Sequence, residues 1–124
     1  MNDPIRKGGI YWIPDSTVAL PPNTLKDRVQ HPRRPFLVVS NDIENTDESW
    51  LIVLGFPLST SKDFSTKFDI PLAAGTASLP EECWIRVPML QPISKAKLME
   101  QIGRLDANTM EACIGQMLMY MAEL

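Results

Sequence analysis

Two apolar stretches, Phe36 to Ser40 (FLVVS) and Trp50 to Phe56 (WLIVLGF), decide the fold of this 124-residue chain. Both are short and rich in β-branched or aromatic residues, and a proline precedes the first of them, which is typical of β-strands. The second stretch is almost entirely apolar, so we expect both of its faces to be covered. The polar segment between them, Asn41 to Ser49, predicts a turn, so the two strands should pair antiparallel.

The neighbouring segments extend this sheet. Gly9 to Ile13 predicts a first strand that ends at a proline, and weaker strands are expected at Lys67 to Leu72 and at Cys83 to Val87. The segment from Asp15 to Arg34 reads as a long polar loop, and loops of this length in compact domains are usually functional or disordered. The eleven prolines of the chain favour many short strands over long helices.

The C-terminal third predicts helices. Ser94 can cap a short helix through Glu100, and Asp106 or Asn108 can cap a longer helix near the end of the chain. Apolar residues of the longer helix recur every three or four positions and form one stripe: Met110, Cys113, Ile114, Met117, Leu118, Met121 and Leu124. We expect this stripe to pack on the sheet, although its methionines, with Met119 and Tyr120, also suit an adaptable dimer contact.

Length and composition indicate a single domain, residues 1–124, of mainly β class: a small, strongly bent antiparallel sheet or barrel with a C-terminal α-helix. No apolar run reaches the ~20 residues that cross a bilayer, and the first residues lack the apolar core of a signal peptide, so we expect a cytoplasmic protein. Cys83 and Cys113 have no metal-ligand or redox spacing, and the chain has one histidine. We therefore expect two buried thiols and neither a metal nor another cofactor.

The net charge of −3 is unevenly distributed along the chain. Residues 1–35 carry six basic and three acidic side chains, whereas residues 36–124 carry six basic and twelve acidic side chains. A diffuse electrostatic attraction to nucleic acid is therefore excluded. Binding to a polyanion has to be local and to involve the N-terminal third.

Polar side chains gather where the two central strands begin and end. Arg34 precedes the strand at Phe36, while Ser59 and Thr60 follow the strand that starts at Trp50. The start of one antiparallel strand lies beside the end of its neighbour, so these side chains should share one rim of the sheet. A guanidinium beside hydroxyl groups suits a phosphodiester. The competing interpretation is a solvated strand edge beside an ordinary Ser-Thr-Ser turn.

Several short motifs follow one another in a fixed order. They are Gly8 to Trp12 (GGIYW), Arg33 to Asn41 (RRPFLVVSN), Ile52-Val53 leading to Pro57 to Ser61 (PLSTS), and Ile93 to Leu98 (ISKAKL) followed by Ile102 to Leu105 (IGRL). Their order and spacing, over nearly the whole chain, resemble the MazF/PemK toxin family. The chain departs from the family pattern at Gly9, where the family has an acidic residue, and at Met89, Gln91 and Ser94.

The resemblance implies an SH3-like barrel, a homodimer, and an endoribonuclease that cuts single-stranded mRNA at short sequences, with an antitoxin partner whose flexible tail covers the RNA groove. The family's catalytic arginine and hydroxyl map to Arg34 and Ser59, with Thr60 as the competing hydroxyl. The RNA's own 2′-hydroxyl is the expected nucleophile, without a metal ion, and Arg34 would stabilise the charge of the pentacoordinate phosphate. His31 is better suited than an arginine to move protons, although a loop histidine is often a bystander.

The long loop from Asp15 to Arg33, before the strand at Phe36, is the expected specificity element. Basic and hydroxyl-bearing side chains expected to contact RNA are Lys26, Arg28, His31, Arg33, Ser61 and Lys62. Trp12 is either a platform for a stacked base or a buried core residue. In the runner-up interpretation, the same outline resembles CcdB-type toxins, which bind and inhibit DNA gyrase and cleave nothing. A third possibility is an inactive relative retained as a protein-interaction domain.

Overall fold

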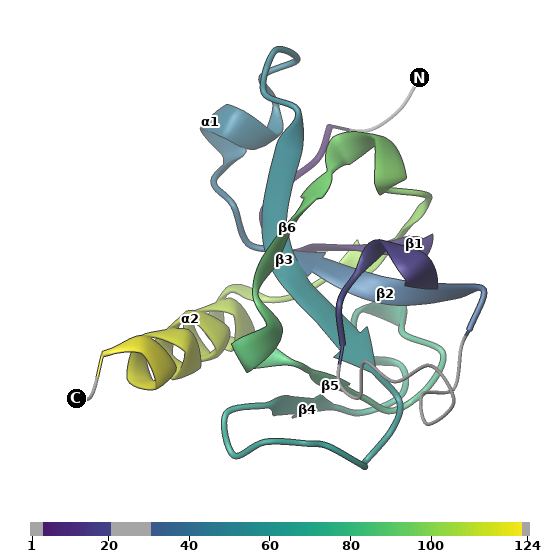
Figure 1. The fold of residues 1–124 in the computed structure, drawn as a ribbon, viewed down its shortest axis with the longest axis vertical. Coiled ribbons are helices and arrows are strands. Elements are labelled where there is room, and N and C mark those ends of the chain that lie inside the picture. The colour runs from purple at the N-terminus through teal and green to yellow at the C-terminus, as the bar shows by residue number, and fades with distance from the viewer. Residues whose placement is uncertain (1–3, 21–30, 123–124) are drawn as a thin grey trace.

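The computed structural model describes residues 4–20 and 31–122, which form a curled antiparallel sheet followed by one long helix (Figure 1). The strands are β1 (Gly9–Pro14), β2 (Arg33–Val38), β3 (Ile52–Ser59), β4 (Ile70–Leu72), β5 (Cys83–Ile85), β6 (Gln91–Ser94) and β7 (Gln101–Arg104). The helices are α1 (Asp42–Asn45) and α2 (Ala107–Met121). The strands follow the order β4-β5-β3-β2-β1-β7, and β6 also pairs with β3. The predicted class, a bent antiparallel sheet with a C-terminal helix, is confirmed.

The sheet bends along β3, which changes partners along its length. The first half of β3 pairs with β6, and its second half pairs with β2 and β5. Gly55 lies at this change, where a Cβ atom would come within 2.1 Å of the Leu37 carbonyl oxygen and 2.5 Å of the Phe36 ring. Only glycine therefore allows β2 and β3 to approach so closely at this point.

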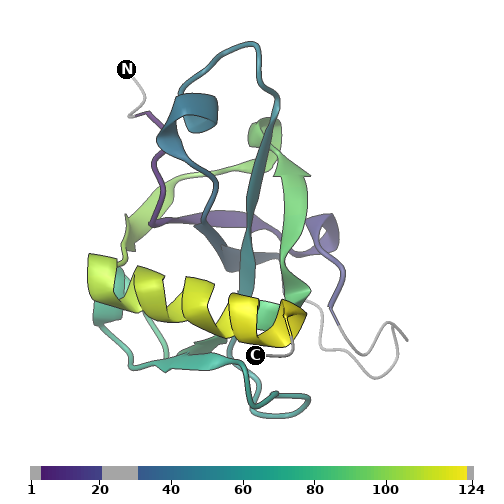
Figure 2. The ribbon, with the colours of Figure 1, turned by 90° about the vertical axis from the view of Figure 1, so that its left-hand side faces the viewer.

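The expectation that both faces of this strand are covered is wrong for its first half. Ile52 is 44% exposed and Leu54 is 38% exposed. Figure 2 shows the reason: α2 runs across the lower part of the molecule and leaves α1 and the first half of β3 uncovered on that side. An apolar run of sequence does not reveal how far a covering helix reaches.

Each face of the bent sheet has its own core, because successive side chains of a strand point to opposite faces. The cluster on the side of α2 comprises Ile10, Leu37, Phe56, Leu58, Leu72, Leu79, Cys83, Ile85, Val87, Leu105, Met110 and Cys113. The cluster on the opposite face comprises Tyr11, Ile13, Val18, Leu20, Phe36, Val38, Val53 and Ile93. Val18 and Leu20 belong to the segment that was expected to be a polar loop. Both are buried in this cluster, so the first residues of that segment pack in the core.

The predicted C-terminal helix is present as α2, and its N-cap is Asp106, whose side chain accepts a hydrogen bond from the backbone N–H of Thr109 at 2.7 Å. Met110 and Cys113 are buried in the core cluster, so the first half of the apolar stripe packs on the sheet as expected. The last turns expose Leu118, Met119, Tyr120 and Met121. No helix in the described ranges is long and apolar enough to span a membrane.

Several element boundaries differ from the sequence-based expectation. β2 begins at Arg33, three residues earlier than predicted, because Arg33 and Arg34 pair with Pro14 and Ile13 of β1. Both arginines therefore belong to the sheet and not to the loop. The helix expected to follow Ser94 is a single 3₁₀ turn, Lys95–Lys97, which Ser94 does cap. It is short because β6 and β7 flank it on both sides.

Candidate active site

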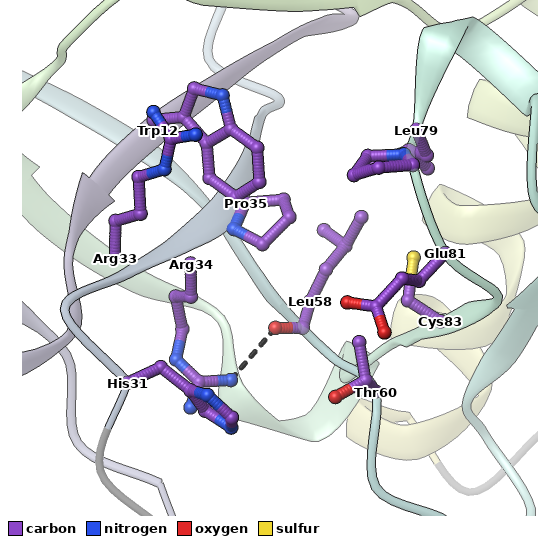
Figure 3. A pocket seen from close by; sticks show the side chains of 11 residues that line it. Trp12, His31, Arg33, Arg34, Pro35, Leu58, Thr60, Leu79, Glu81 and Cys83 are labelled. Atoms are coloured by element: carbon purple, nitrogen blue, oxygen red, sulfur yellow. Dashed lines mark hydrogen bonds between the residues drawn. The ribbon is translucent and has the colours of Figure 1, made fainter.

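A pocket opens between β2, the end of β3 and the segment that leads into β5 (Figure 3). The residues that line it are Trp12, His31, Arg33, Arg34, Pro35, Leu58, Thr60, Leu79, Pro80, Glu81 and Cys83. Its cavity volume is about 70 Å³, well below the ~300–1,000 Å³ that is usual for sites of drug-sized ligands. The pocket can therefore admit a small polar group.

Arg34 supplies the fixed positive charge of this pocket. Its side chain is 7% exposed, and its Nε atom donates to Oδ1 of Asp15 at 2.6 Å. Its Nη1 atom donates to the carbonyl oxygen of Leu58 at 2.8 Å, the bond drawn in Figure 3. Within the described part of the chain, Nη2 makes no hydrogen bond. The guanidinium is thus held from two sides and keeps one nitrogen for a ligand.

Asp15 holds Arg34 in this position. It follows β1 directly, and its side chain is 2% exposed. Its second oxygen, Oδ2, accepts a hydrogen bond from the backbone N–H of His31 at 2.9 Å. Its own backbone N–H donates to the carbonyl oxygen of Pro32 at 3.4 Å. Asp15 therefore ties the end of β1 to the entrance of β2. Sequence reasoning missed this role, because nothing local distinguishes Asp15 from other polar residues after a strand.

The structure separates the two candidate hydroxyl groups. Thr60 is exposed and lines the pocket together with Arg34. Ser59 is half-buried, is not among the pocket residues, and accepts a hydrogen bond from the backbone N–H of Ser61 at 3.2 Å. Arg34 and Thr60 therefore line the same pocket, and Ser59 does not.

The candidate RNA-binding residues fall into three groups. His31 and Arg33 line the pocket. Ser61 and Lys62 are exposed and lie farther along the loop that follows β3, outside this pocket. The remaining two, at positions 26 and 28 (Lys26 and Arg28), lie outside the described residues.

The mouth of the pocket carries a stacked arginine and tryptophan. The guanidinium carbon of Arg33 lies 4.0 Å from the centre of the Trp12 ring. Nη1 of the same arginine lies 3.4 Å from Oε1 of Glu100. Trp12 is half-buried, so it is both a packed residue and part of the pocket wall. Because guanidinium groups and aromatic rings both stack on nucleobases, this pair forms a surface suited to a base.

A second buried ion pair holds the loop after β3. Arg86 is 5% exposed, and its Nη1 atom donates to Oδ2 of Asp69 at 2.8 Å. Its Nη2 atom donates to the carbonyl oxygens of Ser61 and, at 3.3 Å, of Asp63. The arginine therefore fastens the loop that begins at Thr60. Sequence reasoning missed it, because its partners lie 17 to 25 residues away along the chain.

The residues at which the chain departs from the family pattern contact parts of the protein outside the pocket. A Cβ atom at Gly9 would lie 2.7 Å from the ring of Tyr11, so that ring occupies the space of a side chain. The side-chain oxygen of Gln91 accepts from the N–H of Ala19 at 3.0 Å, and its amide nitrogen donates to the carbonyl oxygens of Ala19 and Met89 at 3.1 and 2.9 Å. Gln91 therefore ties Ala19 to β6, and neither Gly9, Met89 nor Gln91 lines the pocket.

Both cysteines are free thiols in the core, as expected. Burial raises the pKa of Cys83 to about 11, with Glu81 and Glu82 adding to the shift, and burial also raises the pKa of Cys113 to about 11. Cys83 lines the pocket but stays protonated at neutral pH, so it is not a nucleophile there. In residues 4–20 and 31–122, no group of three His, Cys, Asp or Glu side chains is arranged to hold a metal ion.

Comparisons with known proteins point to one family. The profile of the family described as PemK-like, MazF-like toxin of type II toxin-antitoxin system matches residues 6–118. Among solved structures, MazF of Deinococcus radiodurans is similar with a TM-score of 0.72 and 16% identity, over 97% of this chain and 98% of that chain. An endoribonuclease in complex with its cognate antitoxin, from a mycobacterial species, has a TM-score of 0.66 and 14% identity, over 97% of this chain and 95% of that chain. The search of curated proteins found no match.

Proposed function

The chain belongs to the family of PemK-like, MazF-like toxins of type II toxin–antitoxin systems, and we propose that it is an endoribonuclease that cleaves single-stranded mRNA without a metal ion. The observation that carries the proposal is the pocket that Arg34 and Thr60 line together. The similar mycobacterial protein is named an endoribonuclease, which supports the same activity here.

The chemistry we propose uses the 2′-hydroxyl of the RNA as the nucleophile. Its attack on the adjacent phosphorus forms a pentacoordinate phosphate with added negative charge, and the bond to the 5′-oxygen then breaks. Arg34 is suited to stabilise that charge, because its guanidinium is held in place before substrate arrives. The hydroxyl of Thr60 is suited to donate a hydrogen bond to a phosphate oxygen from the other side of the pocket. The products are a 2′,3′-cyclic phosphate and a 5′-hydroxyl.

The departing 5′-oxygen needs a proton. Arg34 is a poor donor, since a guanidinium stays protonated in proteins. The imidazole of His31 lines the same pocket as Arg34. We assign it as the proton donor to the leaving oxygen.

Beyond the reacting phosphate, the RNA would contact the exposed basic side chains and the stacked pair of Arg33 and Trp12. One neighbouring base would stack at Arg33 and Trp12, and the strand would continue toward Lys62 along the loop after β3. Ser61 and the residues at positions 26 and 28 extend the candidate set. Few cations are available, so we expect binding to depend less on salt than in strongly basic RNA-binding proteins.

The partners we propose are a cognate antitoxin, whose segment would cover the pocket, and a second copy of the chain. The mycobacterial structure named above contains a cognate antitoxin, which supports the first partner. The exposed apolar residues of the last turns of α2 support a homodimer: Leu118, Met119, Tyr120 and Met121. Light scattering of the purified protein, alone and with the antitoxin, measures both assemblies.

The proposed activity is tested by incubating the purified protein with a mixed single-stranded RNA, with and without EDTA. Cleavage that persists in EDTA and leaves cyclic phosphate ends is the expected result. Cleavage that stops in EDTA would contradict the metal-independent mechanism. Intact RNA together with binding to DNA gyrase would replace the proposal with the CcdB-like function, and intact RNA without such binding would indicate an inactive relative.

A further inference from the structure

Glu81 places a carboxylate in the pocket. It belongs to the segment between the 3₁₀ turn Thr76–Ser78 and β5, and it is exposed and lines the pocket with Arg34 and Thr60. Figure 3 shows its carboxylate directed into the pocket on the side of Thr60. It makes no hydrogen bond or ion pair to any residue in the described ranges. A carboxylate in this setting is available to a ligand.

The segment that carries Glu81 is fixed at both ends. Leu79 is 2% exposed and Cys83 is 1% exposed, and both belong to the core cluster on the side of α2. The backbone N–H of Leu79 donates to the carbonyl oxygen of Thr76 at 2.9 Å, and its carbonyl oxygen accepts from the N–H of Gly75 at 2.8 Å. The carboxylate is therefore presented from a rigid support, which is the condition for a positioned catalytic group.

The proposed cleavage needs a proton acceptor for the 2′-hydroxyl, and the other carboxylate near the pocket is already engaged. Asp15 is 2% exposed and bonded to Arg34 and to the backbone of His31. Among the residues that line the pocket, Glu81 is the sole carboxylate. We propose that Glu81 is the general base of the reaction, an inference that rests on the proposed ribonuclease function.

Two protons move in the proposed step. The carboxylate of Glu81 accepts the proton of the 2′-hydroxyl while the 2′-oxygen forms a bond to phosphorus. The bond between phosphorus and the 5′-oxygen breaks, and that oxygen takes a proton from a ring nitrogen of His31. One proton has moved from RNA to Glu81 and one from His31 to RNA, so neither an oxidant nor a metal ion is required.

The neighbouring residue offers a matched control. Glu82 is exposed but does not line the pocket, so Glu82→Gln makes the same change in charge one residue away. We expect Glu81→Gln to slow single-turnover cleavage by about 100- to 10,000-fold, the usual range for a general base. Glu82→Gln should leave the rate within about twofold, and both variants should bind an uncleavable 2′-methoxy RNA like the wild type.

A substrate with sulfur in place of the bridging 5′-oxygen separates the base from the acid, because a thiolate leaves without a proton. It should restore cleavage by His31→Gln but not by Glu81→Gln, and restoration of Glu81→Gln would overturn the assignment of the base. Equal rates for Glu81→Gln and Glu82→Gln, with an active wild type, would also overturn it and leave the ribonuclease function standing. A wild-type protein that cleaves no RNA would overturn the proposed function, and the role of Glu81 with it.

Discussion

Two buried arginine–aspartate pairs flank the end of β3. They differ in whether the arginine keeps a nitrogen that can bind a ligand. The pair of Arg34 and Asp15 has side chains 7% and 2% exposed, and the pair of Arg86 and Asp69 has side chains 6% and 1% exposed. Arg86 uses both of its terminal nitrogens on Asp69 and on loop carbonyl oxygens. Arg34 uses Nε and Nη1 and faces a pocket. The two ion pairs are therefore equally buried. They differ because a ligand can reach Arg34, whereas both terminal nitrogens of Arg86 are already bonded.

The largest effect expected is on stability, and it should be similar for both pairs. Arg34→Ala and Arg86→Ala should each lower the free energy of unfolding by about 3–5 kcal/mol, because each leaves a buried carboxylate unpaired. Urea denaturation followed by circular dichroism measures this loss. As a control, replacing both Arg86 and Asp69 by leucine should recover much of it. An Arg86→Ala protein as stable as the wild type would show that this pair is not buried in solution.

The next largest effect is on the rate of RNA cleavage, and it should differ between the two ion pairs. Arg34→Lys keeps the charge but loses the fork of donors, so cleavage of RNA should slow by about 100- to 1,000-fold, as when one donor to a transition-state oxyanion is removed. Arg86→Lys acts only through the loop that carries Thr60, so its rate should fall by less than about tenfold, or ~1.4 kcal/mol. Single-turnover rates at saturating protein give both values. Equal losses would contradict the distinction drawn between the two regions.

The two thiols extend the comparison, because Cys83 lines the pocket whereas Cys113 belongs to α2 and is buried in the core cluster. Burial raises the pKa of each to about 11 from an ordinary value of 9.0. The unfolded chain therefore loses these protons first as the pH rises, and stability should fall between pH 9 and 11. We expect a loss on the order of 1 kcal/mol per thiol at pH 10. Denaturation of Cys83→Ala and Cys113→Ala at pH 8 and 10 should show a smaller decrease than the wild type, and an unchanged decrease would exclude the thiols as its cause.

The smallest effect concerns the ion pair at the pocket mouth. Arg33 and Glu100 have side chains 45% and 74% exposed, so Glu100→Gln should change the free energy of unfolding by less than about 1 kcal/mol. The same substitution releases Arg33 from its partner, so the fluorescence of Trp12 should change while the fold does not. A destabilisation as large as that of Arg86→Ala would mean that this pair is structural as well.

The fold was largely predictable because it depends on local patterns. The apolar runs located β2 and β3 to within three residues, and Asp106 marked the start of α2. β6 and β7 were not foreseen, since each is four residues long and is a strand only through its pairing with β3 or β1. The exposed first half of β3 depends on the reach of α2, which no local pattern encodes.

The candidate site was predictable only in part. The antiparallel pairing of β2 with β3 was enough to predict that Arg34 and Thr60 lie at one rim. In such a pair, the start of one strand lies beside the end of the other. β3 continues to Ser59, three residues past the predicted end, and adjacent residues of an extended chain point to opposite sides. That alternation separates Ser59 from Thr60. In the sequence, Asp15 and Glu81 look like ordinary exposed polar residues. The tertiary structure places Asp15 behind Arg34 and Glu81 in the pocket.

The most direct test of the difference between the two regions is the NMR signal of each arginine Nε–H during titration with an uncleavable 2′-methoxy RNA. We expect the signal of Arg34 to shift with added RNA while the signal of Arg86 stays in place. A shift at Arg86 with no change at Arg34 would contradict it and would place the RNA on the other side of β3.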